Sequence, residues 1–329
     1  MKKILGDPET LVDQSLAGFA RAHAVHVRAD TANRLCVRRE APVAGKVALI
    51  SGGGSGHEPL HAGFVGAGML DAAVLGDVFA SPTTDQVIAA INATDSGAGV
   101  LLIIKNYTGD VINFRSAAGE AGEEGHEVQF VVVDDDVATR GGAGTGGRGT
   151  AATVFVEKIA GAIAERGAPL AEVAAVARAV VERSRSIGIA LEACTTPMAG
   201  RPTFELGPDE IEFGVGIHGE AGIERRPHGD VSALAEQMLT TLLEGEPLAS
   251  GPVIVLVNGF GATPAIELYL LFDEVARLLE ARGFEIARSL VGDFVTSLDM
   301  AGASITLLAL DEELLELWDA PVATATLNW

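Results

Sequence analysis

Residues 46–59 read KVALISGGGSGHEP, an apolar run followed by four glycines, two serines and then His57, Glu58 and Pro59. The run predicts a short buried strand, and the glycines predict a turn where that strand ends. In open α/β sheets, ligands bind outside the carboxyl ends of the strands, and glycines let the backbone approach a ligand closely. We therefore expect a small-molecule site at this turn, with His57 at its rim.

The pattern around this stretch alternates between strands and helices. Apolar runs at 72–75, 99–105 and 128–133 predict further buried strands, and helical spacing occupies 84–92 and 111–124. This alternation predicts an α/β fold with mostly parallel or mixed sheets, in which glycine loops at strand ends form the site.

The glycine tract matches none of the common nucleotide or nucleophile motifs. It lacks the glycine spacing of the dinucleotide fingerprint and the Lys-Ser/Thr pair of a P-loop. It also fails as a nucleophile elbow, because His57 stands two residues after Ser55. A glycine turn that merely packs against a helix remains an alternative.

The chain is long enough for two domains. Helical patterns at 8–24, 151–166 and 170–183 belong to the first part, whereas strand patterns at 212–217, 253–257 and 304–310 follow a Pro/Gly-rich region. We predict an N-terminal domain at 1–185 and a C-terminal domain at 186–329.

Composition narrows the classes of partner. The net charge of −22 argues against nucleic acids and anionic membranes, which attract basic surfaces. The apolar runs are far shorter than the roughly 20 residues of a bilayer span. Cys36 and Cys194 have no metal-like spacing and no secretion signal precedes them, so we expect reduced thiols and a cytoplasmic protein.

Two further clusters end predicted strands. In IIKNYTGD (103–110), Lys105 ends a strand, and Asp110 either caps the next helix or faces the same crevice as His57. In FGVGIHGE (213–220), His218 stands between glycines at the end of a predicted strand, where access to its imidazole is open. A structural or solvent-facing histidine is the competing interpretation.

Other polar clusters suggest weaker hypotheses. Asp134–Asp136 are expected in loop and capping roles rather than at a metal site, because three adjacent carboxylates do not point one way. GAGTGGRG (142–149) has a faint likeness to the phosphate loop of tubulin-like GTPases. NGFGATP (258–264) predicts a glycine turn that opens a helix. The basic side chains that could bind an anion or solvate a turn are Arg225, Arg226 and His228.

Taken together, nine stretches resemble the K-subunit family of dihydroxyacetone (glycerone) kinases, in order from Lys2 to Trp329. They are KVALISGGGSGHEP, GDVFASPTTDQV, GVLLIIKNYTGD, VVVDDDVA, SIGIALEACTTP, FGVGIHGE, GATP, TSLDMAG and DAPVATATLNW. The resemblance implies a subunit that binds dihydroxyacetone or a similar short ketose and presents its hydroxyl for phosphorylation.

The resemblance also assigns roles to residues. His218 would bond covalently to the ketose carbonyl as a hemiaminal, and His57 and Asp110 would act on the hydroxyl to be phosphorylated. The ketose would further contact Gly54, Ser55, Gly56 and Lys105. No metal ligand is expected in this chain.

The nucleotide is expected elsewhere. In this family it sits with Mg²⁺ on an L subunit, either as exchangeable ATP or as ADP recharged by a phosphotransferase-system protein, and this sequence leaves both open. The resemblance also suggests a homodimer. A kinase subunit for a four-carbon ketose such as erythrulose, a non-catalytic ketose-binding regulator and a tubulin-like hydrolase are the alternatives. Extra glycines in 140–150 depart from the family pattern and put the order of that loop in doubt.

Overall fold

The computed structural model describes residues 2–140, 146–244, 248 and 251–329. They form two compact units, each with its own sheet. The first consists of Met1–Val133, Thr153–Val181 and Leu314–Trp329, and the second of Asp134–Ala152 and Glu182–Glu313. The change at residues 181/182 falls near the predicted boundary, but the units are discontinuous in sequence. The division at 185/186 stays a prediction.

The first unit is built on a six-stranded mixed sheet with the order β1-β2-β5-β3-β6-β7. Strands β5, β3, β6 and β7 run parallel to one another. Strand β2 runs antiparallel to its neighbour β5, and β1 runs antiparallel to β2. The strands are β1 (Val27–Asp30), β2 (Leu35–Arg38), β3 (Ala48–Ser55), β5 (Ala72–Val78), β6 (Val100–Lys105) and β7 (Val128–Val133).

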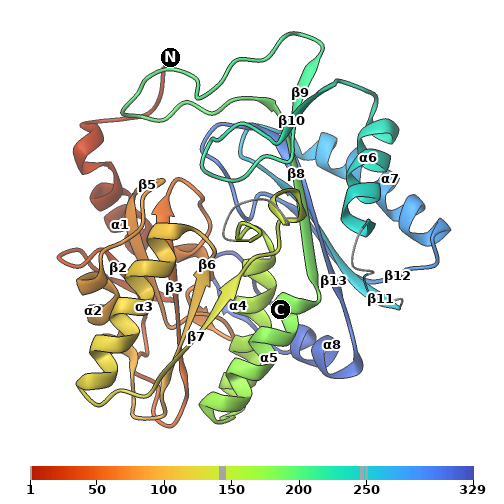
Figure 1. Ribbon diagram of the computed structural model, residues 1–329. Helices are drawn as coiled ribbons and strands as arrows, with labels where there is room; N and C mark the ends of the chain where they lie inside the picture. The colour runs from red at the N-terminus through yellow and green to blue at the C-terminus, as the bar shows by residue number, and fades with distance from the viewer. Residues whose placement is uncertain (1, 141–145, 245–247, 249–250) are drawn as a thin grey trace. The chain divides into compact units, whose positions relative to one another are not determined.

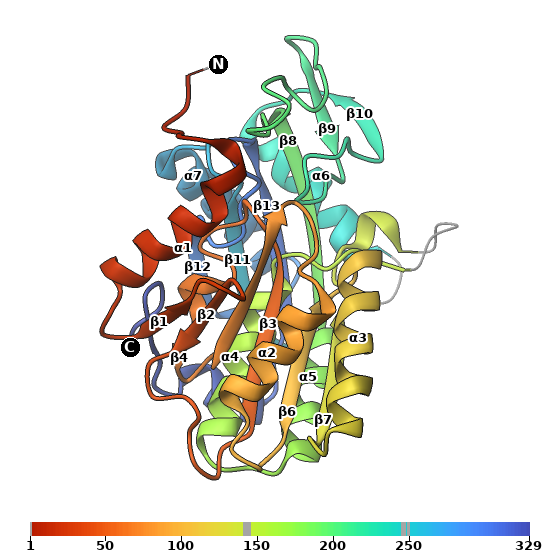
Figure 2. The ribbon, with the colours of Figure 1, turned by 90° about the vertical axis from the view of Figure 1, so that its left-hand side faces the viewer.

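Helices cover both faces of this sheet. On one face lie α2 (Thr84–Thr94) and α3 (Thr108–Glu123), and on the opposite face lie α4 (Ala152–Glu165) and α5 (Leu170–Glu182) (Figures 1 and 2). A capping box of Thr83 and Gln86 starts α2. The core on that side holds alternate residues of the strands, such as Val100, Leu102 and Ile104 of β6. The intervening residues, Lys105 among them, therefore point toward the α4 side.

Several smaller elements complete the first unit. Helix α1 contacts β1, β2 and β5, and the two-residue strand β14 pairs antiparallel with β4, although they are more than 250 positions apart in the sequence. These elements are η1 (Pro8–Thr10), α1 (Leu11–Ala22), η2 (Ala62–Phe64), β4 (Gly66–Ala67), α8 (Glu312–Asp319) and β14 (Ala323–Thr324).

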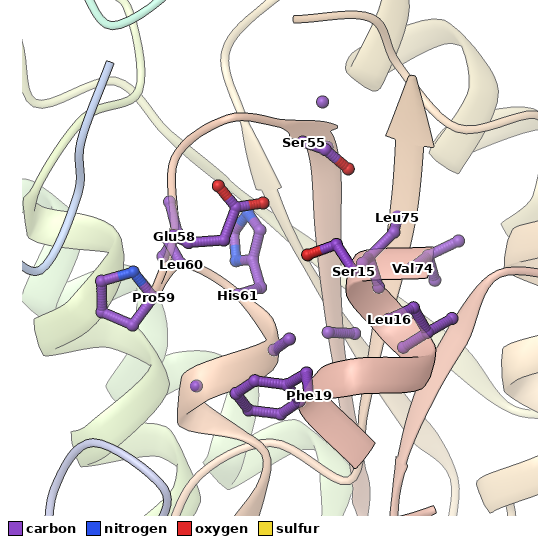
Figure 3. Close-up of a pocket in the computed structure, with 15 residues that line it drawn as sticks. Ser15, Leu16, Phe19, Ser55, Glu58, Pro59, Leu60, His61, Val74 and Leu75 are labelled. Carbon is purple, nitrogen blue, oxygen red and sulfur yellow. The ribbon is translucent and has the colours of Figure 1, made fainter. Parts of the chain in front are cut away.

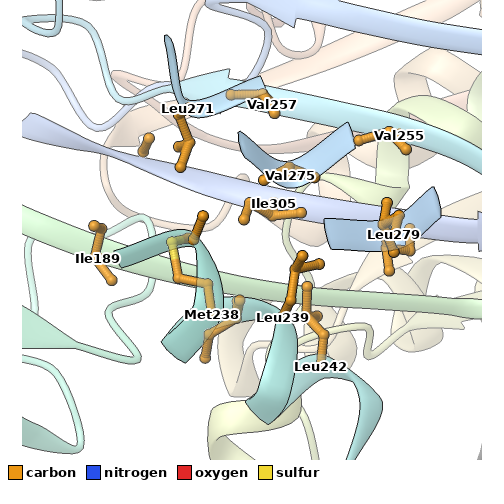
Figure 4. Close-up of a cluster of buried hydrophobic side chains, with 14 of the residues drawn as sticks. Ile189, Met238, Leu239, Leu242, Val255, Val257, Leu271, Val275, Leu279 and Ile305 are labelled. Carbon is orange, nitrogen blue, oxygen red and sulfur yellow. The ribbon is translucent and has the colours of Figure 1, made fainter. Parts of the chain in front are cut away.

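The second unit has a six-stranded sheet with the order β10-β9-β8-β13-β11-β12, which is antiparallel except for the pair β11 and β12. Its core lies between this sheet and helices α6 and α7 (Figure 4). The elements are η3 (Val137–Thr139), β8 (Ser184–Glu192), β9 (Glu210–Phe213), β10 (Glu224–Pro227), α6 (Val231–Leu243), β11 (Pro252–Gly259), α7 (Ala265–Ala281), β12 (Glu285–Gly292) and β13 (Ala301–Ala309).

The predicted α/β class with mixed sheets is confirmed. Both cysteines are free and buried. Within the part of the chain that the structure describes, none of the helices combines the length and the hydropathy that a bilayer crossing requires. Of the predicted glycine loop at 140–150, residues 141–145 lie outside the described residues.

Candidate active site

The glycine tract lies within a strand, which corrects the prediction of a turn. Strand β3 continues to Ser55 and is buried along its whole length. It continues because Gly52–Gly54 pair with β5, in register with Val74, Leu75 and Gly76. The turn follows Ser55, at Gly56, whose φ is +103°.

At each glycine of β3, a neighbouring group occupies the space that a side chain would need. A Cβ at Gly52 would lie 2.5 Å from the carbonyl oxygen of Val74, and one at Gly54 would lie 2.6 Å from the backbone nitrogen of Ala80. At Gly53 the φ of +155° disfavours any side chain, and a Cβ would overlap the ammonium nitrogen of Lys105. The absence of side chains at these glycines thus lets other parts of the protein pack closely against β3, and the closest of them is the charged Nζ of Lys105.

Lys105 is the last residue of β6 and is fully buried. Its Nζ donates to the carbonyl of Gly52 (2.9 Å), lies 2.7 Å from Nε2 of His61 and lies 3.7 Å from Oδ2 of Asp110. Burial lowers the pKa of Lys105, and the carboxylates of Asp110 and Glu157 oppose that shift.

Asp110 lies in the first turn of α3 and is buried. The residue before α3 is Tyr107, which makes no side-chain capping bond, and the Asp110 carboxylate instead faces Lys105. Burial raises the pKa of Asp110, while Lys105 and the side chain of Ser81 act in the opposite direction. A carboxylate with a raised pKa is a stronger proton acceptor than an exposed one, so Asp110 has the properties of a general base.

His57 follows β3 and is fully buried, with its ring stacked on that of Phe79 (centroids 5.1 Å apart). The neighbouring predicted ligand contacts already carry hydrogen bonds. Ser55 Oγ donates to the carbonyl of Gly76 (2.8 Å), and the Gly56 amide donates to the carboxylate of Glu58 (3.1 Å). A ligand there would donate to the hydroxyl of Ser55, which retains acceptor lone pairs, or would replace these bonds.

Two buried residues beside this group, His61 and Glu157, were not among the residues predicted from the sequence. Nδ1 of His61 lies 2.6 Å from Oε1 of Glu157, and both side chains are almost completely buried. Burial, reinforced by the charge of Lys105 and by His57, holds the pKa of His61 well below its usual range. Burial also raises the pKa of Glu157 well above its ordinary value, against the effects of Lys105 and Ser51. A charged residue within the apolar α4 pattern was the available signal for Glu157.

A cavity of about 60 Å³ lies between α1 and the segment that links β3 to η2 (Figure 3). Ser15, Leu16 and Phe19 of α1 line one part of it, and Glu58 and His61 line another. The lining is mainly apolar. The cavity therefore borders His61, and Glu58 is the acidic side chain that lines it.

His218 belongs to the second unit, on the segment between β9 and β10, and is partly exposed. The predicted strand at 212–217 is corrected, because β9 ends at Phe213 and Gly214 turns the chain with a φ of +73°. The His218 amide donates to Glu220 Oε2 (2.8 Å), and Glu220 Oε1 accepts from Arg148 (3.1 Å). This segment is therefore held by a carboxylate and a guanidinium within its own unit.

The predicted site residues therefore fall into two groups. His57, Lys105 and Asp110, together with Gly54, Ser55 and Gly56, lie in the first unit around the end of β3, whereas His218 lies in the second. Their assigned roles in binding and catalysis stay predictions.

The remaining predicted clusters have structural contacts. Asp136 caps η3 through the Ala138 amide (3.0 Å), and Asp135 accepts from the amides of Thr150 and Ala152. Arg225 pairs with Glu212, and Arg226 stacks over the ring of Phe213. The turn at 258–264 opens α7 as predicted. Among the described residues, no group of three or more His, Cys, Asp and Glu side chains is arranged to hold a metal ion.

Comparison with known proteins finds relatives along the full chain. The family model of the Dak1 domain matches residues 17–326. The dihydroxyacetone-binding subunit DhaK of the PEP-dependent dihydroxyacetone kinase of Escherichia coli (strain K12) is 47% identical over 356 residues, covering 100% of this chain and 99% of that protein. The PTS-dependent counterpart from Listeria innocua is 49% identical and covers 98% of this chain and 99% of its own length.

Solved structures give the same result for the fold. The dihydroxyacetone kinase of C. freundii has a TM-score of 0.88 at 37% identity and covers 100% of this chain and 60% of its own. The operon co-activator DhaQ has a TM-score of 0.89 at 33% identity, with 95% of this chain and 97% of that chain covered. Strong structural likeness therefore extends both to a kinase and to a regulator.

Proposed function

Because this chain belongs to the Dak1 domain family, we propose that it is the ketose-binding subunit of a dihydroxyacetone kinase, a phosphotransferase. The observation that carries the proposal is the match, at 47–49% identity and over nearly their whole length, to subunits named for binding dihydroxyacetone. The buried group at the end of β3 supports it, since it supplies a candidate base, Asp110, and a cation, Lys105, within 3.7 Å of each other.

His218 is the proposed covalent anchor of the ketose. The unprotonated imidazole nitrogen adds to the carbonyl carbon, the carbonyl oxygen becomes a hydroxyl by taking up a proton, and the other ring nitrogen loses its own. This hemiaminal forms only with a carbonyl compound. It therefore selects dihydroxyacetone over glycerol by reactivity, and it also admits a four-carbon ketose such as erythrulose. The partial exposure of His218 on a glycine-flanked segment supports this role.

Asp110 and His57 are the proposed proton acceptors at the other end of the substrate. The ketose hydroxyl oxygen forms the new bond to phosphorus, the bond from phosphorus to the nucleotide breaks, and the hydroxyl proton passes to one of the two side chains. We place the nucleotide with its Mg²⁺ on an L subunit, because residues 46–59 lack a P-loop. The phosphoryl donor on that subunit could be ATP that exchanges with solution, or bound ADP that a phosphotransferase-system protein phosphorylates again. The active form is proposed to be a homodimer.

A regulator without catalytic activity is the second candidate. The operon co-activator DhaQ shares the fold at a TM-score of 0.89. Such a protein would bind the ketose and leave it unphosphorylated in the presence of an L subunit.

Separate measurements of binding and turnover test the proposal. We expect the purified chain to form a mass adduct with dihydroxyacetone and none with glycerol, and His218→Ala to abolish the adduct. Asp110→Asn and His57→Ala should keep the adduct and lower phosphorylation in the presence of an L subunit by about 10²–10⁴-fold.

Three outcomes would contradict particular parts of this proposal. An adduct that survives in His218→Ala removes the anchor role, and unchanged turnover in Asp110→Asn and His57→Ala removes the base role. Phosphorylation by the chain with ATP but without an L subunit overturns the two-component scheme. An adduct without turnover at any L concentration favours the regulator.

A further inference from the structure

Three buried side chains from different elements form a continuous chain of contacts in the first unit. Glu157 of α4 lies 2.6 Å from Nδ1 of His61, and Nε2 of His61 lies 2.7 Å from Nζ of Lys105. His61 follows β3, 44 positions before Lys105 and 96 before Glu157. Lys105 in turn faces Asp110. The chain of contacts therefore ends at the proposed base.

Hydrogen-bond chemistry fixes the tautomer of His61. When Lys105 is protonated, its ammonium group has only donors, so Nε2 of His61 accepts from it. In a neutral imidazole the proton then sits on Nδ1, where it is donated to Oε1 of Glu157. Its low pKa keeps His61 in this neutral form. With the opposite tautomer, an N–H group would point at the ammonium and repel it.

The same contacts determine where the charge of Lys105 lies. Two hydrogen-bond directions of Nζ are taken by the carbonyl of Gly52 and by His61, and the nitrogen occupies the space that a Cβ of residue 53 would fill. The ammonium is thereby held 3.7 Å from the Asp110 carboxylate. Removal of His61 as an acceptor would free the lysine side chain to turn away from Asp110.

We propose that His61 and Glu157 are positioning residues, which fix Lys105 beside Asp110 and so keep that carboxylate ionised for phosphoryl transfer. Glu157 acts by fixing the tautomer of His61, and His61 acts by accepting from Lys105. Neither needs to touch the ketose. The inference rests on the proposed function of Asp110 as a base.

The pH dependence follows from the charged groups that face one another here. Asp110 on α3 faces Lys105 on β6, and Lys105 also faces Glu157 on α4 and His61, which has His57 as a further titratable neighbour. Burial raises the pKa of Asp110, and the Lys105 cation limits that rise. Displacement of Lys105 must therefore raise the pKa of Asp110, so that the base becomes protonated at a higher pH and the acid limb of the rate profile moves upward.

The test compares His61→Leu, Glu157→Leu and Glu157→Gln in the full chain with an L subunit. Both leucine variants should lower kcat by about 10²-fold, shift the acid limb of kcat to higher pH and leave the mass adduct with dihydroxyacetone intact. Glu157→Gln retains an amide oxygen that accepts from Nδ1 of His61, so it should keep the wild-type acid limb and most of kcat. Glu165→Gln, on the same helix but paired with Arg38, is the control for disturbance of α4 and should leave the profile unchanged.

If the leucine variants fail to fold, a second measurement that does not depend on turnover still tests the proposal. In wild-type protein labelled with ¹⁵N-histidine, the His61 resonances should show a neutral ring protonated at Nδ1 across neutral pH. The same state should persist in Glu157→Gln. A ring protonated at Nε2, or a His61 that titrates near neutral pH, overturns the inference.

The outcomes separate this inference from the proposed function. A wild-type chain that neither binds nor phosphorylates a ketose defeats the proposed function. A wild-type chain that turns over, with leucine variants that keep its kcat and acid limb, defeats only the positioning role. Glu157→Gln that behaves like Glu157→Leu also overturns it, because the charge of Glu157, and not the tautomer of His61, would then be the effective feature.

Discussion

At Gly53 a single missing side chain allows a charge to approach the sheet. The ammonium of Lys105 occupies the space that a Cβ would take, and the Asp110 carboxylate lies just beyond it. The sequence pattern alone indicates that these glycines leave room for a ligand. The structure shows that protein groups from β6 and α3 already fill much of that room. The identity of these groups depends on contacts about 50 positions apart, which local patterns do not reveal.

Gly53→Ala should therefore damage both stability and site. A φ of +155° is unfavourable for alanine by about 1–3 kcal/mol, and the methyl group would also displace Lys105. We expect a lower urea midpoint and reduced turnover.

Gly119→Ala is the matched control for this change. Gly119 lies within α3 with no atom within 4 Å of a built Cβ, so alanine should stabilise the helix by about 0.5–1 kcal/mol. A Gly53→Ala protein as stable as the wild type would refute the steric argument.

At the scale of elements, α4 carries two adjacent charges into the interior. Glu157 faces His61, whereas Lys158 donates to the carbonyl of Leu317 (2.9 Å) and lies over the ring of Trp329. The sequence predicted this helix correctly to within one residue at each end. The partners of these two charges could not be predicted, because they come from distant segments of the chain. Trp329, for example, lies 171 positions after Lys158.

Burial lowers the pKa of Lys158 to about 8, from an ordinary value of 10.5. Between these values the unfolded chain binds a proton that the folded chain has released, so raising the pH favours the folded state. We expect wild-type stability to rise relative to Lys158→Met from about pH 8 to 10.5, by at most about 3 kcal/mol.

Urea unfolding of the two proteins at several pH values measures this difference. The lost bond to Leu317 changes the offset between the two curves but not their relative slope. Parallel curves across this range would show that the folded and unfolded states hold the Lys158 proton equally well.

The strands show why some elements were predictable and others were not. Apolar β7 matches its predicted range of 128–133. The sequence does not predict the start of strand β8, because its first residues, Ser184, Arg185 and Ser186, are typical of a loop. Ser186 is nevertheless buried, and its hydroxyl donates to Asp135, about 50 positions earlier in the chain. Strand β12 lies at a sheet edge with exposed residues and has no apolar signature.

At the scale of the whole molecule, the first unit contains the two ends of the described chain and omits most of its middle. The prediction of two contiguous domains rested on a local change of composition, which carries no information about a return of the chain. That return depends on short contacts. Strand β14 pairs with β4, and the amide of Thr326 donates to the carbonyl of Gly63 (3.1 Å), two residues after His61.

Deletion of residues 321–329 should therefore destabilise the first unit. It removes the buried side chains of Val322 and Leu327, each worth about 1.5–3 kcal/mol, together with the pairing of β14 with β4. We expect a lower midpoint of urea unfolding and faster proteolysis within 58–70.

The control is deletion of residues 2–6, where Ile4 is fully exposed, which should change neither property. Equal effects of the two deletions, or no effect of the C-terminal one, would contradict this role of the last strand.

The return of the chain also sets an order of events during protein synthesis. A ribosome that adds about 5–20 residues per second needs roughly 10–40 s to make the 134–313 stretch of about 180 residues. Helix α4, at residues 152–165, is synthesised near the start of this interval, whereas the first 133 residues lack the closing strand β14 until after its end. Contacts of the last residues, such as the hydrogen bond from Thr326 to Gly63 near His61, form only once translation has reached them, and until then this part of the first unit stays accessible to chaperones and proteases.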